Sequence, residues 1–158
     1  MRKLATTAIL SAFLLIQSCG ASDFATQLRV ILAASGPLIE SLNLGEAKSK
    51  VIVNFTELAS DAAHMADAIK TCGSDKPCKL NAVAAFKADF DRISLRGIFS
   101  AHPKLQRVGE ILDGIIDAAR IYYGERRPSV ATAGPMPAQN AEKDLNDRLK
   151  ELKAAMRP

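Results

Sequence analysis

The sequence predicts an all-α protein: a small helical bundle of about four helices with a disulfide-stapled helical hairpin, a flexible linker and a C-terminal amphipathic helix. Apolar residues beyond the N-terminal segment recur at steps of three and four, which is the spacing of one helix face. The same region lacks the alternating pattern that is typical of strands. Aromatic residues make up only 5% of the 158 residues and alanine is abundant, which favours closely packed helices.

The first helix is expected to run from Asp23 to about Asn43. Pro37, in the sequence Ser-Gly-Pro, should kink or break it, because proline lacks an amide donor and crowds the preceding turn. Gly45 then ends the segment. The residues expected to face inward are Phe24, Leu28, Ile31, Leu38 and Leu42.

The second helix has the clearest apolar seam, and Gly73 is expected to terminate it. Asp75 and Pro77 then open the third helix, as a capping residue and an early-turn proline. The two helices should therefore form an antiparallel hairpin with a tight turn. The seam of the second helix alternates steps of four and three and consists of Val51, Phe55, Leu58, Ala62, Met65, Ile69 and Cys72.

The third helix should end near Gly97, and Pro103 should start the fourth helix after a short loop. In the fourth helix Gly109 and Gly114 allow a neighbour to approach closely, and Gly124 ends it. The expected inward residues are Leu80, Val83, Phe86, Phe90 and Ile93 in the third helix, and Leu105, Val108, Leu112, Ile115, Ala119 and Tyr122 in the fourth.

Residues 125–139 change composition abruptly and predict a flexible linker, because they are rich in small residues and proline and have no apolar period. Residues 140–158 predict a short, highly charged helix. An isolated helix of this length is marginal, so its narrow apolar stripe should pack against its own bundle, another copy or a partner. We expect the bundle up to about Gly124 to fold without this tail. The stripe consists of Leu145, Leu149, Leu152 and Met156.

Residues 1–18 have the features of an export signal. Arg2 and Lys3 form a positive region, and the apolar run that follows ends at Ile16. This run is too short to span a bilayer, which requires about 20 residues. We therefore predict a segment that is removed on export rather than a membrane helix.

The sequence Leu15-Ile16-Gln17-Ser18-Cys19 resembles the lipobox of bacterial lipoproteins. That motif has an aliphatic residue three positions before the cysteine and a small residue directly before it. Ile16 and Ser18 match the motif, whereas Gln17 is an uncommon residue between them. The resemblance covers residues 1–19 only, and the rest of the chain resembles no family that we can name.

The resemblance implies that the chain is cut before Cys19, that diacylglycerol is attached to its sulfur and that the new amino group is acylated. Two or three acyl chains, at ~0.8 kcal/mol per buried methylene, hold a protein stably on a membrane. Gly20, in place of the aspartate that signals retention at the inner membrane, favours the outer membrane facing the periplasm in a Gram-negative host. The alternative is ordinary secretion, with cleavage after Gly20 or Ala21.

The other two cysteines, Cys72 and Cys78, predict a disulfide, because an exported chain meets an oxidising environment. A zinc site would require four ligands, and no histidine lies beside the pair. A redox pair would favour a C-x-x-C spacing, which this pair lacks.

The charge of the chain argues against a nucleic-acid partner. The net charge is +4, and two of the 21 basic residues lie in the first 18 residues, so the exported part is close to neutral. Basic and acidic residues are also interspersed, whereas proteins that bind nucleic acid concentrate Lys and Arg on one face.

The sequence predicts no catalytic, cofactor-binding or metal site, and no cofactor. His64 lies between Asp61 and Asp67, a spacing that can bind metal in a helical bundle, but no other helix repeats the required Glu-x-x-His pattern. We interpret this group as a solvated polar flank, and His102, just before Pro103, as a helix-entry residue. A metal-dependent enzyme that uses His64 is the least favoured function.

The leading function hypothesis is a membrane-anchored lipoprotein of the cell envelope that acts as a non-enzymatic interaction or scaffolding module. The alternative is a carrier of a small apolar ligand in the bundle core. The expected partners are the membrane, through the lipid on Cys19, and a protein bound through the C-terminal helix. The predicted division is a signal peptide (1–18), a bundle (19–124), a linker (125–139) and an amphipathic helix (140–158).

Overall fold

The computed structural model describes residues 23–124 and 138–158. The predicted signal peptide, Cys19 and residues 125–137 of the predicted linker lie outside the described residues. The described chain is all-α, as predicted. Its elements are α1 (Phe24–Ala33), α2 (Gly36–Ser41), α3 (Ala47–Thr71), α4 (Lys76–Ser94), the short 3₁₀ helix η3 (Phe99–Ala101), α5 (Pro103–Tyr122) and α6 (Ala138–Ala155).

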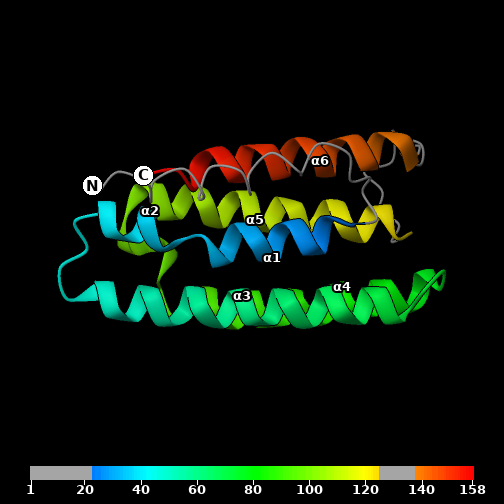
Figure 1. Ribbon diagram of the computed structural model, residues 1–158, viewed down its shortest axis with the longest axis horizontal. Helices are drawn as coiled ribbons and strands as arrows, with labels where there is room; N and C mark the ends of the chain where they lie inside the picture. Colours follow the sequence, from blue (N-terminus) through cyan, green and yellow to red (C-terminus); the bar gives the residue numbers. More distant parts are fainter. Residues whose placement is uncertain (1–22, 125–137) are drawn as a thin grey trace, which may run out of the picture.

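The helices form a bundle in three layers (Figure 1). The hairpin of α3 and α4 forms one outer layer, α1 and α5 lie in the middle, and α6 covers the opposite side. Helix α1 packs against both α3 and α6, and α5 packs against α6, α4 and η3. No helix of the described residues is long and apolar enough to cross a membrane.

The predicted break in the first helix is confirmed. Helix α1 ends at Ala33, and α2 begins at Gly36 with Pro37 in its first turn. The break lets both halves face the core, because Leu28 of α1 and Leu38 of α2 are both fully buried. The helical segment ends at Ser41, slightly before the expected Asn43, because Leu42 is already extended.

The α3–α4 hairpin is closed at its turn by the predicted disulfide. Cys72 and Cys78 are bonded, with 5.6 Å between their Cα atoms. Gly73 adopts a positive φ of 56°, which allows the chain to leave α3 in a left-handed turn. The carboxylate of Asp75 then accepts a hydrogen bond of 3.1 Å from the backbone N–H of Cys78, so it caps α4 as expected.

Polar contacts join the opposite end of the same hairpin. Glu57 of α3 accepts hydrogen bonds of 2.6 Å from both Arg92 and Arg96. Arg96 also donates to the side chain of Asn54, which is buried, while the Lys50 amine donates to the Arg96 carbonyl. The guanidinium groups of Arg92 and Arg96 hold the pKa of the Glu57 carboxyl below its usual value. These contacts and the disulfide therefore set the alignment of α3 and α4 at both ends.

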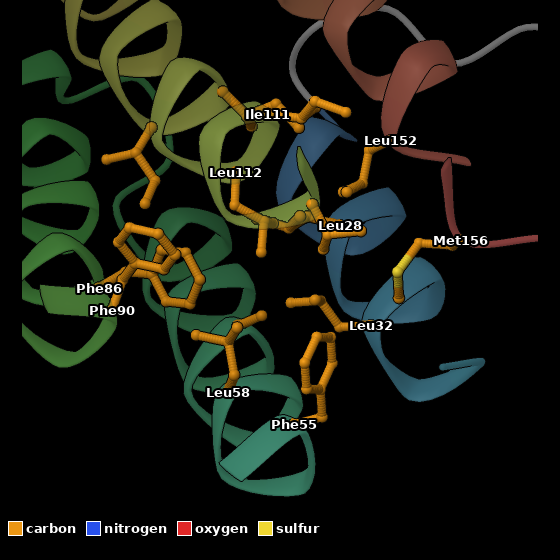
Figure 2. Close-up of a cluster of buried hydrophobic side chains, with 14 of the residues drawn as sticks. Leu28, Leu32, Phe55, Leu58, Phe86, Phe90, Ile111, Leu112, Leu152 and Met156 are labelled. Carbon is orange, nitrogen blue, oxygen red and sulfur yellow. The ribbon is translucent and has the colours of Figure 1, made fainter. Parts of the chain in front are cut away.

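The core is filled by large side chains from every α-helix. Figure 2 shows some of them, from α1, α3, α4, α5 and α6. All inward residues predicted for α3 are buried except Cys72, which is half-buried in the disulfide. The predicted inward residues Ile31, Leu80 and Tyr122 are also only half-buried. Buried core residues that the predicted seams omitted include Leu32, Ile39, Ile98, Ile111, Ile116 and Tyr123.

The C-terminal helix is part of this core. Leu145, Leu149, Leu152 and Met156 are each at most 7% exposed. Figure 2 shows Leu152 and Met156 pointing toward Leu28 of α1 and its neighbours. Of the three surfaces proposed for the apolar stripe, the structure therefore selects the bundle of the same chain. The expectation that the bundle up to Gly124 forms a separate unit does not fit this packing. Helix α6 also starts at Ala138, two residues before the predicted 140.

The two glycines of α5 have neighbours at short distance, as predicted. A Cβ atom at Gly109 would lie 2.8 Å from the ring of Phe99 in η3. At Gly114 it would meet the guanidinium group of Arg148 from α6. Gly109 therefore accommodates a buried ring, whereas Gly114 accommodates the end of a flexible side chain.

Replacing both Cys72 and Cys78 with serine should lower the free energy of unfolding by roughly 2 kcal/mol without loss of the fold. The bridged loop is short, and Glu57 and the apolar seam still align the two helices. Denaturant unfolding of the variant and the parent measures this difference. A variant that no longer unfolds cooperatively would show that the hairpin depends on the bond.

Candidate functional site

The end of the bundle that carries the disulfide also carries the first described residue. Asp23 precedes α1 there, and the α3–α4 turn and the last turn of α5 lie at the same end (Figure 1). The predicted lipidation residue, Cys19, precedes Asp23 by four positions. We call this end of the molecule the anchor end.

A groove of about 480 Å³ lies at the anchor end. It is formed between the start of α1, the last turns of α3 and the first turn of α4. Its lining is largely polar. The residues that line it are Asp23, Ala25, Thr26 and Arg29 from the first segment, Ala66, Asp67, Ile69, Lys70 and Gly73 from the second, and Lys79 from α4.

The charged side chains of this groove are not paired with each other or with other described residues. Asp23, Arg29, Asp67 and Lys70 form no ion pair within 4.0 Å in the described part of the chain. Elsewhere, exposed charges between helices do form pairs, such as Arg107 with Glu151. Among the described residues, the groove therefore presents three cations and two carboxylates that have no ion-pair partner.

An aromatic cluster lies next to the groove. The ring of Tyr123 packs 6.1 Å from the ring of Phe24 and 5.1 Å from that of Tyr122, measured between centroids. The amine of Lys79 lies over the Tyr123 ring, 5.7 Å from its centroid, in cation–π contact. The Tyr123 hydroxyl is buried without a hydrogen-bond partner among the described residues. Burial raises the pKa of Tyr123 to about 12.

Replacing Tyr123 with phenylalanine should leave stability near neutral pH unchanged or raise it by up to about 1 kcal/mol, because the substitution removes an unpaired buried hydroxyl. In the parent the folded state holds the phenolic proton more tightly than the unfolded state. Stability should therefore fall as pH rises from about 10 to 12, and the variant should lose this component of the decline. Urea unfolding across that range tests it, with the half-buried Tyr122→Phe as control. An identical alkaline decline in parent and Tyr123→Phe would contradict the assignment.

Asp61, His64 and Asp67 lie in three different surroundings. The interpretation of this group as one solvated polar flank is therefore corrected. Asp61 lies in the α3–α4 interface, 3.9 Å from Arg92, and one of its carboxylate oxygens is buried without a hydrogen bond. Burial, reinforced by Asp89, raises the pKa of Asp61. His64 is exposed, and Asp67 lines the groove on another side of α3. The described residues contain no group of three side chains suited to hold a metal ion.

His102 has the structural role that the sequence indicated. Its Nδ1 accepts a hydrogen bond of 3.1 Å from the backbone N–H of Lys104, so His102 is the N-cap residue of α5. This explains its position before Pro103.

Sequence reasoning did not identify the groove. Arg29, Lys70 and Lys79 lie on three helices, and each appears in the sequence as one of many exposed cations. No periodic pattern relates them, because periodicity reports the faces of single helices. Tyr123 was also missed, since the predicted seam of α5 ended at Tyr122.

Comparisons of the chain with protein-family models, with curated proteins and with solved structures gave no match.

Proposed function

We propose that this chain is a lipid-anchored protein of the cell envelope that acts as a non-enzymatic interaction or scaffolding module. The observation that carries the proposal is the sequence Leu15-Ile16-Gln17-Ser18-Cys19 at the end of an apolar export signal. In a Gram-negative host Gly20 favours the outer membrane, with the bundle facing the periplasm. The disulfide between Cys72 and Cys78 supports export, because such bonds persist in oxidising compartments.

The proposed protein partner of the C-terminal segment would meet a different surface from the one first expected. The apolar stripe of α6 is buried against α1 and α5, so the face left for a partner is charged. Exposed side chains on this face include Lys143, Asp147 and Lys150. A partner of α6 is therefore proposed to bind mainly through charge, with an affinity that falls as salt rises.

The carrier alternative receives no support from the groove. A carrier of an apolar ligand needs a pocket lined mainly by apolar side chains. The groove at the anchor end has sufficient volume, but half of its ten lining residues are charged.

Mass spectrometry of the protein expressed with its own signal in a bacterial host tests the anchor. We expect a mature terminus at Cys19 that carries acyl chains, and partition of the protein into detergent. The matched variant Cys19→Ala should remain unacylated and partition into the aqueous phase. An unmodified terminus at Ala21 or Ser22 in the parent would overturn the proposal.

A further inference from the structure

We propose that the groove at the anchor end binds the headgroup of a phospholipid, with Arg29, Lys70 and Lys79 toward the phosphate and Asp23 and Asp67 toward the ammonium of an ethanolamine headgroup. The assignment deepens the proposed function, because the lipid on Cys19 is what brings the groove to a membrane. The groove would recognise a lipid headgroup, in addition to the attachment that the lipid on Cys19 provides.

The charges of the groove match a zwitterionic ligand. Guanidinium and ammonium groups donate strong, charge-assisted hydrogen bonds to phosphate oxygens, and carboxylates accept them from a primary ammonium. The groove has both kinds of group, and its charged side chains form no ion pairs with the described residues. A purely anionic ligand would leave Asp23 and Asp67 opposed to its charge, so the two carboxylates favour a ligand that also carries an ammonium.

The short segment between Cys19 and Asp23 limits how far the groove can lie from the membrane. Only four residue steps separate Cys19 from Asp23, which lines the groove. Fully extended, these steps span at most about 14 Å. A lipid on Cys19 therefore keeps the rim of the groove within reach of the headgroup layer, whatever the path of the intervening residues.

The size and lining of the groove suit a headgroup rather than acyl chains. Its volume of about 480 Å³ is in the range of small-molecule sites. Its apolar lining is limited to Ala25, Ala66 and Ile69, so the acyl chains would remain in the bilayer. Tyr122, which is half-buried, lies at the same end, and tyrosine is a side chain that favours the membrane interface.

Co-sedimentation of residues 20–158, made without signal or lipid, with vesicles tests headgroup recognition separately from anchoring. Every residue of the described core lies within this segment. We expect binding to vesicles that contain phosphatidylethanolamine and weaker binding to vesicles of phosphatidylcholine alone. The methylated ammonium of phosphatidylcholine cannot donate hydrogen bonds to Asp23 and Asp67.

Two pairs of substitutions with the same loss of charge provide the comparison. The double variant Arg29→Gln/Lys70→Gln should bind phosphatidylethanolamine vesicles about tenfold more weakly, because it loses charge-assisted hydrogen bonds to phosphate. The control Lys48→Gln/Arg107→Gln, outside the groove, should bind within about twofold of the parent. Asp23→Asn/Asp67→Asn should retain binding and lose the preference for phosphatidylethanolamine. Circular dichroism melting verifies that each variant is folded.

The outcomes separate the two proposals. Equal weakening by the groove pair and the control pair would show a general charge effect and overturn the headgroup site, as would equal binding of the parent to both vesicle types. Neither result affects the anchor, which mass spectrometry of Cys19 decides. If Cys19 proves unmodified while the vesicle preference persists, the anchor fails and the headgroup site remains.

Discussion

A chain truncated after Gly124 should lose cooperative unfolding. The truncation removes α6 and its four large buried side chains, Leu145, Leu149, Leu152 and Met156. At about 1.5–3 kcal/mol for each side chain, their burial contributes about 6–12 kcal/mol. The total stability of a domain is only about 5–15 kcal/mol. The loss also exposes the faces of α1 and α5 that α6 covers. Thermal melting followed by circular dichroism should therefore change from a sigmoidal to a gradual transition.

A cut chain provides the matched control for this truncation. Cleavage at a protease site placed between residues 125 and 137 breaks the covalent link to α6 but leaves the helix present. The two fragments should elute together in gel filtration and melt cooperatively, because the buried stripe still holds them. Cooperative melting of the truncated protein, with the helicity per residue of the parent, would show instead that α6 is a separate interaction element.

Gly109→Val should be among the most destabilising single substitutions, with a loss of about 3 kcal/mol in the free energy of unfolding. A Cβ atom at this position would already lie 2.8 Å from the Phe99 ring, and valine adds two methyl groups. Phe99 is only 8% exposed and packs between Phe55 and Phe90, with ring centroids 5.9 and 5.5 Å away. The ring therefore has little room to move, and overpacking of this kind costs about 1–3 kcal/mol.

Gly114→Val is the matched control, because it makes the same change in the same helix. The nearest atoms at Gly114 belong to the guanidinium end of Arg148, which can swing toward solvent. Any steric cost is partly offset, since glycine is the poorer helix former. We expect a change within about 1 kcal/mol, measured by urea unfolding. A loss at Gly114 as large as that at Gly109 would mean that Arg148 cannot move aside, and that contact with the Phe99 ring does not make Gly109 a special position.

Much of the bundle could be predicted from the sequence, because the signals that form its helices are local. A 3–4 apolar period marks the buried face of each helix, and it identified the seam from Val51 to Ile69 without knowledge of any neighbour. Pro37 and Gly73 act through their own backbone, so the break and the turn were predictable. The disulfide between Cys72 and Cys78 followed from their short separation and the expected export.

Of the candidate site, the sequence predicted only the lipidation of Cys19, which lies outside the described residues and stays a prediction. The charge of the groove depends on which lining cations have no ion-pair partner among the described residues once the helices have packed. Arg92 is paired with Glu57, whereas Lys70 forms no ion pair with a described residue, and nothing in their immediate sequence distinguishes them.

The sequence by itself determined the helices, their buried faces, the break before α2 and the closed hairpin, because backbone preference and periodicity act within a few residues. Only the tertiary structure decided which surface the stripe of α6 covers. Burial of an apolar stripe is favourable against any apolar surface, because the hydrophobic effect is not directional. The stripe alone therefore does not predict which surface covers it. The stripe is buried against the apolar faces of α1 and α5. The segment that was expected to be an interaction tail is therefore a core helix of the bundle.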